Sequence, residues 1–275
     1  MPTQWQIALT VVGLLGYGTA AAAAIRRLRG RGAPSSATVT TPLTVGLITV
    51  AAMLIAQIAE GGTLLAVGNA FDAAVLIAWL IAAEVLVLLW AGRLKGIETF
   101  LLPVAAIVQA CSLLIFLRSG PSAPRYVHQW HIIGHGVVIT LATACFVASG
   151  VAGVVYLNVH RAIRGHRQLS VLGRLPALES LERFGRWMVA LGFPLLTFGI
   201  LTGVCGIAHS PPALRAREFL MAGGTVGVWV LYGVAMVIIG LRPRLRGPRA
   251  AALASGAAGL TVLNVLVYLL MRSNA

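Results

Sequence analysis

Eight long apolar runs limit what this chain can fold into. A helix crosses the hydrocarbon core of a bilayer with about 20 mainly apolar residues. The runs lie at Trp5–Ile25, Thr41–Ile58, Ala73–Ala91, Phe100–Leu117, Ile132–Leu157, Phe184–Ile207, Phe219–Leu241 and Ala250–Met271. None of them alternates apolar and polar residues as a barrel strand does, and lipid requires every backbone polar group to be satisfied. The sequence therefore predicts an all-α, polytopic integral membrane helical bundle, with about eight transmembrane helices in a single membrane domain over residues 1–275.

The composition agrees with a chain surrounded by lipid. Hydrophobic residues make up 59% of the sequence and charged residues 10%, whereas soluble domains carry about 25% charged residues. The three cysteines Cys111, Cys145 and Cys205 lie inside apolar runs, without a C-x-x-C or C-x-x-C-H motif. The sequence therefore encodes neither a disulfide framework nor covalent haem attachment.

The basic residues separate by loop. Sixteen of the 21 lysines and arginines fall in the first, third, fifth and seventh loops. Because short cytoplasmic loops carry an excess of Lys and Arg, we expect these loops inside, both termini outside, and a multi-pass protein of a bacterial-type plasma (inner) membrane. The net charge of +14 is then mostly topological. No loop is long enough for a basic module that binds nucleic acid, so we expect no nucleic-acid partner.

The longest connection is cytoplasmic in this topology and covers about residues 158–183. Leu175, Leu178 and Leu181 recur in it at helical spacing beside Glu179 and Glu182. This pattern predicts a short interfacial helix. Arg-rich amphipathic segments favour anionic headgroups, so contact with the lipid bilayer is one role for it.

Glycines recur at spacings that allow helices to approach closely. Gly199 with Gly203 and Gly223 with Gly227 form small-xxx-small pairs, for which we expect tight helix packing. We expect the same of the glycines in the first run, namely Gly13, Gly16 and Gly18.

Sequence motifs of ATPases and hydrolases are absent. The chain has no Walker loop, G-x-S-x-G or H-E-x-x-H motif, and no nucleophile, acid–base pair or metal cage of recognisable spacing. We therefore expect neither an ATP-driven pump nor an enzyme.

Three histidines form a stripe at the start of the fifth run. His128, His131 and His135 are spaced so that they share one helix face, beside Trp130. Imidazole is a good axial ligand for haem iron, and Trp130 could supply part of an apolar wall. An aromatic belt at the membrane interface explains His128 and His131 equally well. His135 lies about a turn deeper, where an ionisable group usually has a partner or ligand.

Three further polar residues are candidates. His209 lies in the loop after the sixth run, on the same predicted side as His135, and could flank the same haem or be an ordinary loop residue. Glu84 is an intramembrane carboxyl group, either functional or hydrogen bonded in neutral form to Gln57 or Gln109. Asp72 precedes the third run, where it is a good helix N-cap.

Five segments, in order, resemble the haem-handling cytochrome c assembly proteins of the CcsA and HemX type. Their sequences are GNAFDAAVLIAW (68–79), ETFLLPVAA (98–106), the helix from His135 to Tyr156, LPALESLERFGRWMVALGFPLLTFGILTG (175–203) and WVLYGVAMVIIGLRPRLRGPRAA (229–251). Asp72 stands where the first motif usually has Glu. The resemblance covers about residues 60–275, and eight spans is the HemX-like number.

The resemblance implies haem transport as a function: haem b, bound non-covalently, is presented at the outer membrane face for cytochrome c-type biogenesis. The implied partners are haem, apocytochrome c and a second assembly membrane protein of the ResB type. Of the family's outer ligands, His135 is the one with a matching position, as a possible haem iron ligand, with Trp130, His131 and His209 as further haem-site candidates. The chain reads VCGIAHSPPALRAREFLMAGGTVGV (204–228) where the family has its tryptophan-rich loop WGxYWxWDPKE.

Three functions therefore stay open. The first is a membrane protein of cytochrome c biogenesis that binds or translocates haem towards the outer face. The second is a HemX-like regulator or scaffold of tetrapyrrole (haem) biosynthesis without haem transport, which the different loop favours. The third is a small-solute transporter using Glu84, although the halves of the chain show no inverted repeat.

Overall fold

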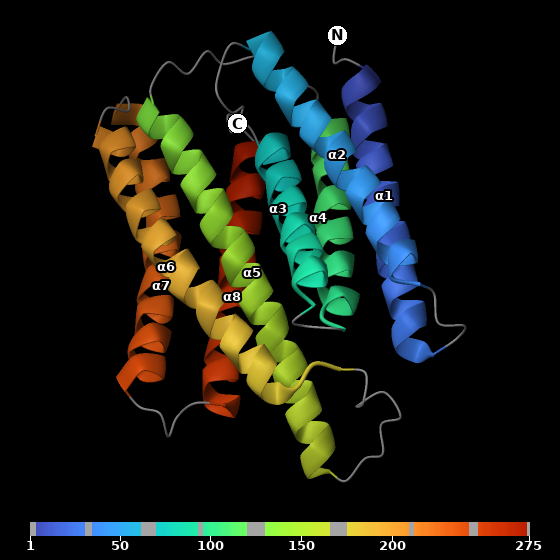
Figure 1. Cartoon of the computed structure of the whole chain (residues 1–275). Helices are drawn as coiled ribbons and strands as arrows, with labels where there is room; N and C mark the ends of the chain where they lie inside the picture. Colours follow the sequence, from blue (N-terminus) through green and yellow to red (C-terminus); the bar gives the residue numbers. More distant parts are fainter. Residues whose placement is uncertain are drawn as a thin grey trace. The chain divides into compact units, whose positions relative to one another are not determined.

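The structure is a computed structural model that describes residues 4–30, 35–61, 70–92, 96–119, 130–165, 175–208, 212–241 and 247–273. These ranges contain eight helices and no strand (Figure 1). The helices are α1 (Gln4–Arg29), α2 (Ser36–Gly61), α3 (Ala70–Ala91), α4 (Glu98–Ser119), α5 (Trp130–Arg164), α6 (Leu178–Ala208), α7 (Pro212–Leu241) and α8 (Pro248–Ser273). The predicted all-α fold is confirmed.

Seven of these helices have the length and composition of membrane spans. In α7 the apolar stretch found among the described residues is shorter, at Ala222–Ile238. The chain is therefore a multi-pass membrane protein. The orientation of its termini stays a prediction.

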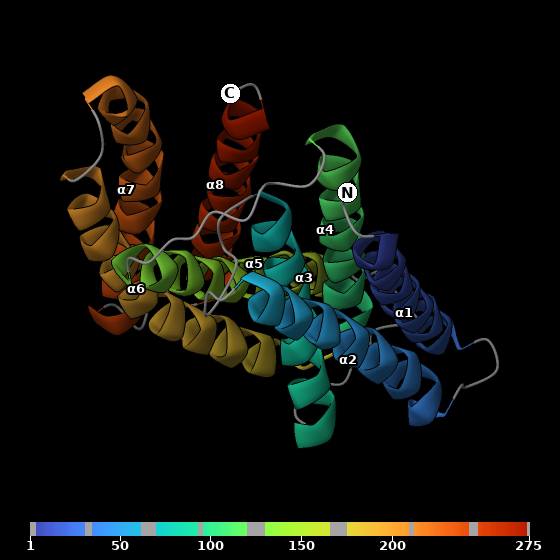
Figure 2. The ribbon, with the colours of Figure 1, turned by 90° about the horizontal axis from the view of Figure 1, so that it is seen from above.

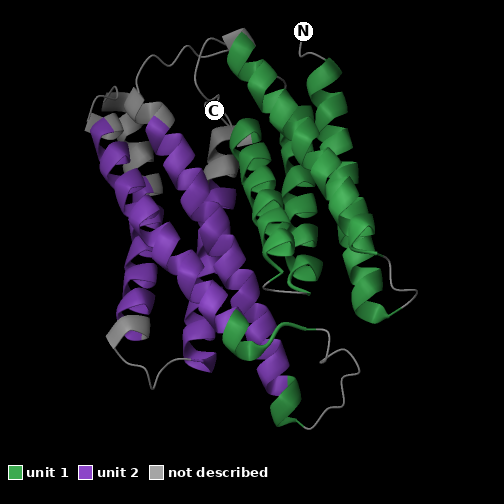
Figure 3. Cartoon of the chain, viewed as in Figure 1, with its two compact units in different colours: residues 1–126, 162–180 green, residues 127–161, 181–275 purple. Residues whose placement is uncertain are grey.

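The chain divides into two compact units (Figure 3). Unit 1 comprises residues 1–126 and 162–180, and unit 2 comprises residues 127–161 and 181–275. Unit 1 therefore holds α1 to α4, and unit 2 holds nearly all of α5 to α8. The prediction of a single membrane domain stays a prediction.

In unit 1, α1 packs against α2 and α4, and α3 packs against the same two helices (Figure 2). The approach of α1 to α2 requires glycine at Gly16, because a Cβ atom there would lie 2.8 Å from both Gly46 Cα and Pro42 O. A Cβ at Gly13 would lie 2.5 Å from Val50 Cγ2. Tight packing is thus confirmed for Gly13 and Gly16. It is wrong for Gly18, which has no described neighbour within 4 Å of such an atom.

Unit 2 has a core of aromatic and small residues. The rings of Phe146 and Tyr232 stack with centroids 3.6 Å apart. Around them lie Ala142, Val189, Leu196, Val228 and Ala257. Close packing is confirmed for Gly199, where a Cβ atom would lie 2.5 Å from Ile139 Cδ1. It is wrong for Gly223 and Gly227, where no atom of another described residue lies within 4 Å of such a Cβ atom. Glycine spacing alone does not determine which helix face meets a partner.

The segment between spans five and six differs from the expectation. Helix α5 continues to Arg164, and α6 begins at Leu178, so much of residues 158–183 extends the two spanning helices. The predicted short helix is not an element of its own, because from Leu178 onward it is the first part of α6. Its position at the membrane interface stays a prediction. The apolar stretch ends at Leu157, where the sequence becomes polar. Residues 158–164 contain no proline or glycine, so the helix continues to Arg164.

Candidate functional site

His135 lies against one face of α6 in unit 2. Its Nδ1 atom is 2.7 Å from the carbonyl oxygen of Gly199 and 3.4 Å from Thr202 Oγ1. A carbonyl oxygen can only accept a hydrogen bond, so Nδ1 carries the proton and donates it to Gly199. The imidazole is partly buried. The contact joins residues 64 positions apart in the chain and fixes the direction of the ring.

The hydrogen bond to Gly199 leaves Nε2 as the basic nitrogen of His135. No described residue forms a hydrogen bond with Nε2. A histidine that donates through one nitrogen to a backbone carbonyl presents the other, with its lone pair, in a fixed direction, which is the usual arrangement of histidine metal ligands. The geometry of His135 therefore suits a ligand for a metal ion.

Gly203 provides the space for the imidazole. A Cβ atom at this position would lie 2.8 Å from His135 Cε1 and 3.1 Å from Nδ1. Thr202 is held in place because its one hydroxyl proton is shared between the carbonyl oxygens of Phe198 and Gly199, each 3.0 Å from Oγ1. The sequence indicated close packing of Gly199 and Gly203, but it did not identify His135 as the neighbour or the Gly199 carbonyl as its acceptor. The G-x-x-T-G spacing is the signal in the sequence that marks this surface.

The remaining residues of the predicted haem site cannot be placed around His135. Trp130 and His131 belong to α5 by their backbone, but their side chains lie outside the described residues, as do His128 and His209 entirely. A second axial ligand from His209 therefore stays a prediction. Among the described residues no group of three His, Cys, Asp or Glu side chains could hold a metal ion. A haem needs fewer protein ligands, because the porphyrin supplies four nitrogens and the protein supplies the axial positions.

Glu84 lies on α3 in unit 1 and does not have the partner considered for it. Its Oε2 atom is buried without a hydrogen-bond partner among the described residues, and so are both polar side-chain atoms of Gln109 and Oε1 of Gln57. The expected hydrogen bond to an amide of Gln57 or Gln109 is therefore wrong. The apolar pattern of each span does not determine which side chains of neighbouring helices meet.

Asp72 lies at the start of α3 and is 6% exposed. Within the described residues the helix begins at Ala70, so Asp72 lies in its first turn and not at the N-cap. A carboxylate in the first turn interacts favourably with the helix dipole. The position in the first turn therefore still favours the start of the helix.

Comparison with known proteins gives two matches. The model of a family described as "Cytochrome C assembly protein" matches residues 67–205, just over half of the chain. Among curated proteins, "Protein HemX" of Brevibacillus brevis is 30% identical over 73 residues, which are 26% of this chain and 27% of that protein. The match thus spans about a quarter of the length of this relative. No solved structure matches the chain.

Proposed function

Since the chain belongs to the cytochrome c assembly protein family, we propose that it acts in cytochrome c biogenesis by binding haem and passing it towards the outer membrane face. In this proposal the chain lies in a bacterial-type plasma membrane. It works with a second assembly membrane protein of the ResB type and delivers haem to apocytochrome c.

The arrangement of His135 on α6 is the observation that carries this proposal. The bond from Nδ1 to the Gly199 carbonyl leaves Nε2 available, and imidazole Nε2 is a common axial ligand of haem iron. His135 also occupies the histidine position of the family's motif and lies in unit 2 with the GFPLLTFGILTG segment. A haem held there would bring the iron and its redox chemistry, while Gly199, Thr202 and Gly203 would keep the imidazole in position.

The test is the yield of mature cytochrome c in cells that depend on this chain. We expect His135→Ala to lower both the haem bound by the chain and the yield of cytochrome c. His160→Ala is the control, because His160 stacks on Tyr156, away from the seat of His135 on α6. An unchanged yield with His135→Ala would rule out the proposed role.

A second pair of variants tests the contact of the His135 imidazole with α6. Gly203→Val places side-chain atoms where His135 now lies, whereas Gly223→Val meets no described neighbour. We expect haem binding to fall at least about tenfold in Gly203→Val, the lower range for losing support of a metal-bound histidine, and to stay unchanged in Gly223→Val. Equal haem binding by both variants would show that the contact with α6 does not orient the ligand.

The similarity to Protein HemX favours a second candidate, a membrane regulator or scaffold of tetrapyrrole biosynthesis. In this role the segment from Asn158 to Glu182 would contact a cytoplasmic partner. The test replaces Arg164, Arg167 and Arg174 together and measures tetrapyrrole levels and co-purified proteins. A loss of a partner with normal cytochrome c yield supports this candidate, and no change in either readout contradicts it.

A further inference from the structure

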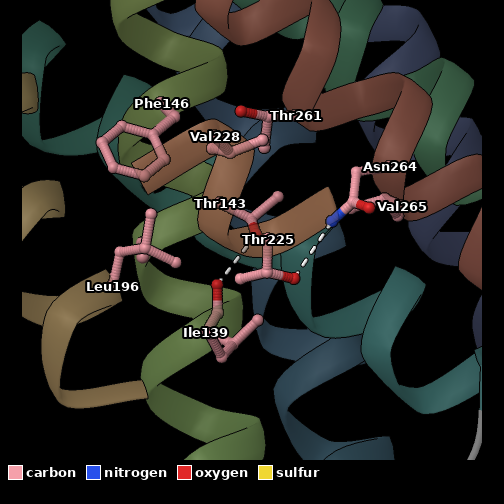
Figure 4. Close-up of a pocket in the computed structure, with 10 residues that line it drawn as sticks. Ile139, Thr143, Phe146, Leu196, Thr225, Val228, Thr261, Asn264 and Val265 are labelled. Carbon is pink, nitrogen blue, oxygen red and sulfur yellow. Dashed lines mark hydrogen bonds between the residues drawn. The ribbon is translucent and has the colours of Figure 1, made fainter. Parts of the chain in front are cut away.

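Unit 2 contains a partly open cavity of about 40 Å³ between α5, α6, α7 and α8 (Figure 4). Its wall is apolar where Phe146, Leu196 and Val228 face it. Four polar side chains also line it, from three of the four helices: Thr143, Thr225, Thr261 and Asn264. Because an empty cavity in a protein is normally apolar, the polar side chains need an explanation.

The polar side chains around the cavity keep hydrogen-bonding capacity after their protein contacts are made. Thr143 Oγ1 donates to the carbonyl of Ile139 at 2.8 Å, and Thr261 Oγ1 donates to that of Ala257 at 2.9 Å. Asn264 Nδ2 donates to Thr225 Oγ1 at 3.2 Å. A hydroxyl oxygen has two lone pairs, so Thr143 and Thr261 can each still accept a hydrogen bond, and Asn264 has a second amide proton.

Tyr232 packs beside this cavity but does not line it. Its ring is 0% exposed and stacks on Phe146, which does line the cavity. Its hydroxyl is next to Thr261, another lining residue. The cavity wall at Phe146 is therefore backed by a second, fully buried aromatic ring.

We propose that this cavity is an internal water site, in which a small cluster of ordered water molecules bridges Thr143, Thr261 and Asn264. One water needs at least about 10–15 Å³ of such space and about three polar partners, so the cavity has room for about two or three waters. The waters accept from the Asn264 amide and donate to the threonine oxygens.

The water site lies directly behind the seat of His135. Ile139 lines the cavity and packs where a Cβ atom on Gly199 would lie, and the Gly199 carbonyl accepts the hydrogen bond of His135. Ile139 is about one helical turn from His135 on α5. The apolar side chain of Ile139 therefore lies between the His135–Gly199 contact and the water site. This inference concerns the four helices of unit 2 and does not depend on haem binding.

Radiolytic labelling of the full chain in nanodiscs, in ¹⁸O-labelled water, tests the proposal. Hydroxyl radicals formed from an ordered internal water label the side chains next to it within the irradiation pulse. We expect Phe146 to take up ¹⁸O several-fold faster than Phe71, which is 6% exposed and packs against the tilted ring of Phe116. Labelling of Phe146 as slow as that of Phe71 would overturn the proposal.

Two threonines of α5 provide matched variants. Thr143 and Thr140 each donate to the carbonyl four residues earlier, but Thr143 lines the cavity and Thr140 does not. We expect Thr143→Val to slow the labelling of Phe146 several-fold and Thr140→Val to leave it unchanged. Equal effects of both variants, or xenon binding in the cavity of the wild-type protein, would show a dry cavity.

Discussion

The two compact units differ in the hydrogen bonding of their buried polar side chains. In unit 2, side chains bond across to a neighbouring helix: His135 to Gly199, Trp229 to Thr197, Ser149 to Gly185 and Asn264 to Thr225. Unit 1 also has such bonds, including Trp79 to Leu47. However, five of the six buried polar side-chain atoms that lack a partner among the described residues lie in unit 1, on Tyr17, Gln57, Glu84 and Gln109.

This difference shows that the two units are stabilised by different means. Polar bonds between helices have strict geometry, so those in unit 2 select one arrangement of α5 to α8 around His135. A buried polar group without a partner costs about 1–3 kcal/mol. Unit 1 therefore depends more on apolar burial and on close contacts at glycine, such as that of Gly16 with Gly46.

The largest change in stability is expected at the close contact between α1 and α2 in unit 1. Gly16→Leu should lower the free energy of unfolding by about 3 kcal/mol, the upper end of the range for overpacking, because the atoms it meets are backbone atoms of α2. Gly18→Leu is the control, since nothing described lies near Gly18, and should change stability by less than about 0.5 kcal/mol. Reversible unfolding in mixed micelles gives both values. Similar losses in the two variants would contradict the account of the α1–α2 contact.

A smaller effect is expected from one polar bond of unit 2. Trp229 Nε1 donates to Thr197 Oγ1 at 2.9 Å. Interhelical hydrogen bonds in membrane proteins contribute about 0.6 kcal/mol on average and up to about 1.7 kcal/mol. A double-mutant cycle of Thr197→Val and Trp229→Phe should give a coupling free energy in this range. A coupling free energy of zero would show that this hydrogen bond does not help to fix the arrangement of the helices in unit 2.

The smallest change in stability is expected when a buried amide is replaced by leucine, and its sign should differ between the two units. Gln109→Leu in unit 1 removes an amide that is 0% exposed and has no described partner, so stability should be unchanged or rise by up to about 1 kcal/mol. Asn264→Leu in unit 2 breaks the bond to Thr225 and should lower stability by about 1 kcal/mol. A clear loss with Gln109→Leu would mean that Gln109 has a partner in the membrane, and the comparison of the units would then fail.

The sequence predicted the helices well because crossing a bilayer requires long apolar helices. Predictions from the sequence were less accurate where they concerned which residues of two helices contact each other. Gly199 and Gly223 have the same type of spacing, yet only Gly199 meets another helix. Glu84 does not meet the amides expected for it, and α5 continues past the point where its sequence becomes polar. Hydropathy reports the medium around a helix, whereas the direction of each helix face depends on contacts between distant residues.

The candidate site shows the same limit. The position of His135 near the start of a span, and its place in a family motif, made it a candidate. The Gly199 carbonyl that fixes its tautomer is 64 residues away, and no periodicity in the sequence connects the two. The pairing of His135 with His209, and the absence of enzymatic activity, stay predictions.

The central claim is that Nε2 of His135 binds haem iron. Absorption spectra of the purified chain, oxidised and dithionite-reduced after expression with added haem, test it most directly. The account predicts a Soret band in the wild type and in His160→Ala, and a band at least about tenfold weaker in His135→Ala. A Soret band of equal strength in His135→Ala, or none in the wild type, would contradict the claim.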